Sequence, residues 1–156
     1  MNMVLNMRFA VLAASLMVAA APAVQAQGAA GPHPAYQHAL SDLRAARRYL
    51  NEGMPTSVPV KRDAEAATKH IDAAVNEIKQ ASIDEDKSLH DSYQVDPGLS
   101  PRDRFHKANE LLLAAHKDLE NAEELPQARQ LRNHAIGEID YAHTIVDNAE
   151  KAGHWQ

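Results

Sequence analysis

Apolar residues recur at alternating steps of three and four in four segments of the chain. This spacing places them on one side of an α-helix, so each segment predicts a helix with a single buried stripe. The four stripes are Tyr36, Ala39, Leu43, Ala46 and Leu50; Ala64, Ala67, Ile71, Ala74, Ile78 and Ala81; Phe105, Ala108, Leu112, Ala115, Leu119 and Ala122; and Ala128, Leu131, Ala135, Ile139, Ala142, Val146 and Ala149. The pattern therefore predicts an all-α protein.

Helix-starting and helix-ending residues flank these segments. Before the third stripe, Ser100 can cap the free backbone amides, Pro101 suits the first helical position, and Asp103 can complete a capping box. Gly53 follows the first stripe and Gly153 follows the fourth, as expected where helices end. Both kinds of signal agree with the boundaries that the periodicity predicts.

The lengths of the connections predict how the helices are arranged. Short links join the first helix to the second and the third to the fourth, which favours antiparallel neighbours, whereas residues 84–100 form a longer polar crossing. The simplest result is an antiparallel up-down-up-down four-helix bundle. The stripe from Tyr36 to Leu50 also matches Phe105 to Leu119 at an offset of 69 residues, and Ile71 matches Ile139 at an offset of 68. Such matches indicate a duplicated helical hairpin, although alanine-rich heptads also produce them by chance.

The first residues have the three parts of a secretory signal peptide. Arg8 precedes an uncharged apolar run over residues 9–21, and small residues end the segment at Ala26. The run is shorter than the roughly 18 residues that span a bilayer, and no second such stretch follows. We expect residues 1–26 to be cleaved and residues 27–156 to form one periplasmic or secreted four-helix domain with no integral membrane span.

The composition excludes several kinds of site and partner. There is no cysteine, so lipid attachment through cysteine, disulfides, thiolate metal sites and covalent c-type haem are excluded. The chain has 16 basic and 21 acidic residues, and loss of Arg8 with the signal leaves 15 and 21, a formal charge of −6. A negative domain of this kind is not expected to bind nucleic acid or anionic membranes.

Nine histidines stand out in a chain with few other reactive groups. A histidine and a carboxylate three or four residues apart on a helix can share one metal ion. The same pairs also occur as solvated surface pairs, so that alternative stays open. The pairs with this spacing are His38 with Asp42, His106 with Glu110, His134 with Glu138, and Asp140 with His143.

Three histidines lie directly beside buried-stripe residues: His70, His116 and His143. If they converge between helices, their imidazoles could bind zinc, copper or non-covalent haem. Histidines in such positions also commonly hydrogen-bond a neighbouring helix. A di-iron site is not expected, because it needs inward glutamates where these stripes carry alanine, leucine and isoleucine. No serine lies in a Gly-x-Ser-x-Gly elbow and no glycine-rich phosphate loop occurs, so catalysis is not the favoured interpretation.

The strings HPAYQHALSDLRAAR at residues 33–47 and HIDAAVNEIKQASIDEDK at residues 70–87 resemble segments of a group of small exported bacterial proteins of uncharacterised function. FHKANELLLAAHKDL at 105–119 and RNHAIGEID at 132–140 fit the same pattern. The resemblance implies a four-helix fold outside the cytoplasm and supplies no reaction. It directs attention to a set of polar residues, namely His33, His38, Asp42, Asp72, Glu77 and Asp84, and His143 is not part of it.

The sequence thus favours a non-enzymatic periplasmic binding or interaction protein, with envelope stress or metal handling as possible settings. The partner is an unknown protein or small ligand. The alternative is a metal-ion or haem carrier that uses the stripe-flanking histidines. Because the predicted core is rich in alanine and poor in aromatic residues, we also expect at most a weak homodimer.

The signal peptide makes a direct prediction about the mature protein. After export, the chain is expected to begin near Gln27, because Val24 and Ala26 give the small residues that signal peptidase requires. Intact-mass measurement of the protein from the extracytoplasmic fraction checks this. A secreted or membrane-bound product that retains residues 1–26 would contradict it.

Overall fold

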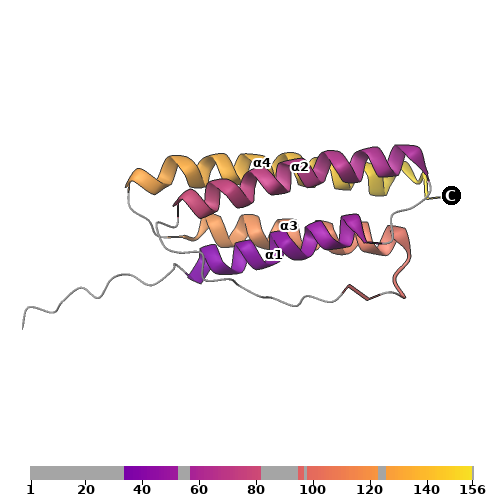
Figure 1. The fold of residues 1–156 in the computed structure, drawn as a ribbon, viewed down its shortest axis with the longest axis horizontal. Helices are drawn as coiled ribbons and strands as arrows, with labels where there is room; N and C mark the ends of the chain where they lie inside the picture. The colour runs from indigo at the N-terminus through magenta and orange to yellow at the C-terminus, as the bar shows by residue number, and fades with distance from the viewer. Residues whose placement is uncertain (1–33, 53–56, 82–94, 97, 123–125, 156) are drawn as a thin grey trace, which may run out of the picture.

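Four α-helices form the part of the chain that the structure describes. The structure is a computed structural model, and it describes residues 34–52, 57–81, 95–96, 98–122 and 126–155. Within these ranges the chain contains no strand, and the helices lie side by side in an elongated bundle (Figure 1). The helices are α1 (Pro34–Asn51), α2 (Val58–Ala81), α3 (Pro101–Glu120) and α4 (Pro126–Ala152). The predicted all-α four-helix bundle is confirmed.

The predicted stripes form the core. Every stripe residue is buried except Leu131, which is partly buried and packs against the others. None of the buried residues in the described ranges is polar or charged, and half of them are alanine. Small side chains let helix axes approach closely, so the core gains packing contacts without large side chains. None of the described helices combines the length and apolar character needed to cross a membrane.

The predicted helix ends are also confirmed. The Ser100 hydroxyl accepts a hydrogen bond from the Asp103 amide at 3.2 Å and donates one to the Asp103 carboxylate at 2.6 Å, with Pro101 following the cap. After α4, Gly153 takes a left-handed conformation with φ of 70°, which suits glycine. Trp155 then packs edge-on against Phe105 at 5.0 Å between ring centroids, so the end of the chain covers the start of α3.

The order of helix directions differs from the predicted up-down-up-down topology. α1 and α4 each pack against both α2 and α3, whereas α1 and α4, like α2 and α3, are diagonal. Arg104, near the start of α3, donates a hydrogen bond to the backbone oxygen of Glu52, just beyond the end of α1, so these two helices are antiparallel. In Figure 1, α1 and α4 run one way, and α2 and α3 run the other. The topology is up-down-down-up, and the predicted order is wrong.

The long connection between α2 and α3 is the physical reason. The 19 residues from 82 to 100 could extend to roughly 60 Å at about 3.3 Å per residue. The 20-residue helix α3 is only about 30 Å long at 1.5 Å per residue. The end of α2 can therefore be joined to a helix that starts at the opposite end of the bundle, the one-crossover connectivity known among helix bundles. Short links force antiparallel neighbours, and this link does not.

This topology suits the internal repeat. Helices α1 and α3 match at the first offset, α2 and α4 at the second, and both matched pairs are antiparallel neighbours (Figure 1). Two antiparallel helices related by a two-fold axis bring a residue against its own counterpart only near that axis. His70 contacts Glu138, which lies 68 residues later, the offset that relates α2 to α4. The geometry therefore agrees with two hairpins around a pseudo-two-fold axis that passes near this pair.

The core can be tested with two adjacent leucines of α3. Leu112 is fully buried, whereas Leu113 is 53% exposed. Leu112→Ala should lower the free energy of unfolding by about 2–5 kcal/mol, because it leaves a cavity between helices. Leu113→Ala should change it by less than about 0.5 kcal/mol. Urea denaturation followed by circular dichroism measures both, and similar losses for the two variants would contradict the packing.

Candidate functional site

Helix α4 presents carboxylates to histidines on both of its neighbours. Each of these contacts joins two helices, and each uses the Nδ1 nitrogen of the imidazole ring. The pairs are His70 of α2 with Glu138 at 2.6 Å, His116 of α3 with Asp140 at 2.7 Å, and His106 of α3 with Glu150 at 3.0 Å. Histidine and carboxylate side chains therefore line both the α2/α4 and the α3/α4 interfaces.

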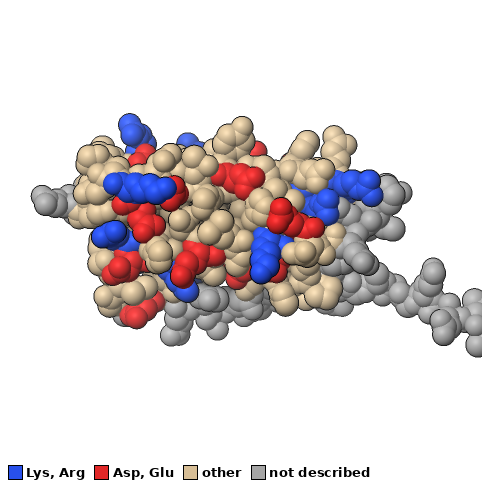
Figure 2. Space-filling view, turned by 180° about the vertical axis from the view of Figure 1, so that it is seen from behind, with Lys and Arg blue, Asp and Glu red and all other residues tan. Residues whose placement is uncertain are grey.

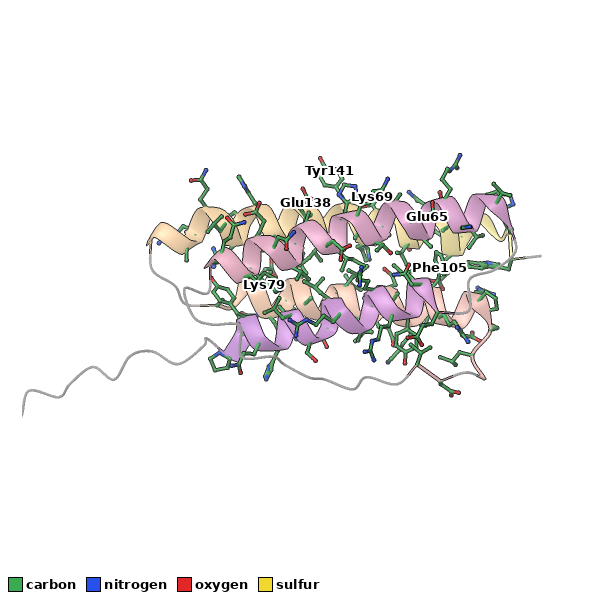
Figure 3. The ribbon with its side chains drawn as sticks, viewed as in Figure 1. Glu65, Lys69, Lys79, Phe105, Glu138 and Tyr141 are labelled. Carbon is green, nitrogen blue, oxygen red and sulfur yellow. The ribbon has the colours of Figure 1, made fainter. Side chains whose placement is uncertain are left out.

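An exposed aromatic side chain accompanies the pair on the α2/α4 side. The ring of His70 stacks on Tyr141 with 5.5 Å between centroids and 27° between planes. Tyr141 follows Glu138 by three residues, so both project from the same side of α4. Tyr141 is 65% exposed and points away from the bundle, on the side where Glu138 also lies (Figure 3). We call His70, Glu138 and Tyr141 the tyrosine patch.

His116 has a carboxylate at each ring nitrogen. Besides Asp140 at Nδ1, Glu120 lies one turn further along α3, with its oxygen 3.2 Å from Nε2. Partial burial of the ring lowers the pKa of His116, but the hydrogen bonds and charges of Glu120 and Asp140 outweigh burial and raise the pKa above its ordinary value of 6.5. The surroundings of this ring therefore favour its charged form.

The predicted pair of His106 and Glu110 forms, but both members have other partners. Their closest nitrogen and oxygen are 3.8 Å apart, whereas His106 lies nearer to Glu150. Glu110 accepts a hydrogen bond from Lys107 at 2.8 Å, and this bond and the lysine charge lower the pKa of Glu110. The pair is thus part of a small surface network of two cations and two carboxylates when the ring is charged.

His38 and Asp42 also lie together on α1, next to α3. Burial raises the pKa of the Asp42 carboxyl, and the charge of Asp118 on α3 raises it further. The charges of His38 and Lys107 partly oppose this change. Asp42 is therefore a half-buried acid that faces a second acid across the α1/α3 interface, which is an unfavourable arrangement at neutral pH.

The remaining predicted residues lie apart from one another. Asp72 forms a salt bridge with Arg47 at 2.8 Å and so joins α2 to α1. Glu77 is partly buried on α2, and one of its carboxylate oxygens has no hydrogen-bond partner in the described structure. His33 and Asp84 lie outside the described residues.

The three stripe-flanking histidines do not form a common ligand set. His70 and His116 contact different helices' carboxylates in separate pairs, and His143 makes no hydrogen bond or ion pair with the described residues. In the ranges that the structure describes, no group of three or more histidine, aspartate or glutamate side chains is placed to hold a metal ion. The structure shows the alternative use for His70 and His116, which is hydrogen bonding to a neighbouring helix.

Sequence reasoning missed the partners of these histidines. It paired Glu138 with His134 and Asp140 with His143 along α4, whereas the structure pairs both acids across helix interfaces. A signal was present, since both acids adjoin the stripe residue Ile139. Elsewhere, acidic and basic side chains are interspersed, and the face seen in Figure 2 has no large patch of one charge.

The electrostatics of Asp42 make a prediction about stability. Its raised pKa means that ionising this group costs stability, and the cost grows as pH rises from 3.8 through the folded-state pKa. Asp42→Asn should therefore raise the free energy of unfolding at pH 7, by no more than about 1 kcal/mol because solvent screens a half-exposed group. The gain should disappear near pH 3.5.

Urea denaturation at the two pH values measures this effect. Asp118→Asn is the matched variant, because it removes the neighbouring charge and should give part of the same gain. An equal effect of Asp42→Asn at both pH values would show that charge is not the cause.

No family model matches the chain, and no curated protein or solved structure matches it either. The resemblance of residues 33–47 and 70–87 to small exported bacterial proteins therefore stays a prediction from the sequence. What the protein does has to be argued from its own surface and interfaces.

Proposed function

We propose that the protein is exported and works outside the cytoplasm as a non-enzymatic binding protein that contacts a partner protein through the tyrosine patch. The observation that carries this proposal is the exposure of Tyr141 together with its stacking on His70. Most large apolar side chains of the described residues are buried, and Tyr141 is one of three that are prominently exposed.

The geometry of the patch suits protein recognition. Tyrosine is enriched among the residues that dominate binding energy at interfaces, because it offers a large apolar area and a hydroxyl with few rotatable bonds. Here the ring rests on His70, and His70 is in turn held by Glu138 at 2.6 Å. A side chain held in this way loses less conformational entropy on binding, which increases affinity.

The rest of the surface supports a partner of mixed polarity. The exposed side chain of Lys69 lies on α2, directly before His70, and Glu138 supplies the opposite charge on α4 (Figure 3). An aromatic centre with charged groups at its edge is the usual composition of a protein-binding surface. Because the described core is entirely apolar, polar recognition would take place on this exterior.

Site-specific photo-crosslinking in the native host tests the proposal. A photo-reactive phenylalanine derivative replaces Tyr141 in the full chain, and the same derivative at Leu113 is the matched control, since that residue is also large, apolar and exposed but lies on α3. We expect a crosslinked protein of defined mass from position 141 and none from position 113, because only the former lies in the patch.

The crosslinked products distinguish the alternatives. A product that contains two copies of this chain would indicate self-association, the weak dimer expected from the sequence, rather than a different partner. Equal crosslinking from both positions, or none from position 141, would contradict the proposed surface.

A further inference from the structure

The α3/α4 interface contains a histidine whose two nitrogens both face carboxylates. His116 directs Nδ1 to Asp140 at 2.7 Å and Nε2 to Glu120 at 3.2 Å. A neutral imidazole has one N–H donor and one acceptor nitrogen, whereas the charged ring donates from both. Ionised carboxylates only accept hydrogen bonds, so both contacts can be hydrogen bonds at once only if the ring is protonated.

A second histidine on α3 has the same arrangement in a looser form. His106 directs Nδ1 to Glu150 of α4 at 3.0 Å, and its Nε2 lies 3.8 Å from Glu110. By contrast, one carboxylate faces the His70 ring, through Nδ1, so a neutral His70 with its proton on that nitrogen can keep the contact. The arrangement that needs a charged ring is therefore found between α3 and α4.

We propose that His116, assisted by His106, is a pH-dependent clasp that fastens α4 to α3 in mildly acidic surroundings and loosens as the pH rises. Protonation gives each ring two donors and a charge that attracts Asp140 and Glu150 on α4. Loss of the proton removes one donor and the attraction, and it leaves at least one carboxylate beside an acceptor nitrogen. The device depends on the two histidines and on no bound partner.

The groups around the two rings agree with this behaviour. His116 is faced by Glu120 of its own helix and Asp140 of α4, and His106 by Glu110 and Glu150, with Lys107 bonded to Glu110. On the α1 side of α3, the acids Asp42 and Asp118 interact with each other, and α2 does not pack against α3. The described charges nearest to both rings are thus mainly negative.

The sign of the effect follows from the pKa of His116, which is raised in the folded protein above 6.5. A group with a raised folded-state pKa contributes stability that is complete below the unfolded-state value. That contribution is lost as the pH rises through the folded-state value. The clasp should therefore be closed near pH 5.5 and open near pH 8.

Two measurements on the exported full-length protein test the clasp. In an NMR titration, the His116 ring should change charge at a midpoint above 6.5, and Asp140→Asn should lower that midpoint. In urea denaturation, the unfolding equilibrium constant should be about two- to tenfold smaller at pH 5.5 than at pH 8, the size expected for partly exposed ion pairs. The double variant His106→Gln with His116→Gln should bring this ratio close to one.

Controls separate the clasp from general effects of pH. His154→Gln removes an exposed histidine beyond the end of α4 that has no ion pair with the described residues, so it should leave the ratio unchanged. If the double variant does not fold, Asp140→Asn and Glu120→Gln provide the same comparison, since each removes one acceptor of His116. A His116 midpoint at or below 6.5, or a wild-type ratio in the folded histidine or carboxylate variants, would overturn the proposal.

Discussion

The burial of four apolar stripes, half of them alanine, is the constraint on which the rest of the structure depends. With no cysteine in the chain, no disulfide can strengthen the bundle, and the helices hold together by packing. Alanine permits this packing because it lets helices approach closely at little loss of side-chain entropy. A close, fully apolar core leaves polar side chains at the outer edges of the helix interfaces.

The position of α4 explains why its carboxylates make so many interhelical contacts. It packs against α2 on one side and α3 on the other. Successive helical residues point about 100° apart, so the two acids that flank the core residue Ile139 point to opposite sides. Glu138 therefore meets His70 on α2, and Asp140 meets His116 on α3. A single buried stripe thus fixes two polar contacts on two different neighbours.

These contacts have different physical consequences. His70 supports an exposed aromatic ring, so its pair with Glu138 gives shape to a surface. His116 lies between two carboxylates, so its contacts respond to protonation. Across the bundle, Asp42 and Asp118 repel each other, and evolution of a tighter bundle at neutral pH would be expected to remove such a pair. Its presence shows that the α1/α3 interface is not optimised for stability alone.

The sequence by itself determined the four helices, their caps and nearly all of their buried residues. These features depend on local spacing and on residues within a few positions of each other, such as Ser100 and Asp103. Only Leu131 is less buried than its place in the stripe predicts. The tertiary structure alone decided the up-down-down-up order and the partners of the histidines. A connection of 19 residues does not dictate where the next helix starts, and contacts such as His70 with Glu138 join residues 68 positions apart.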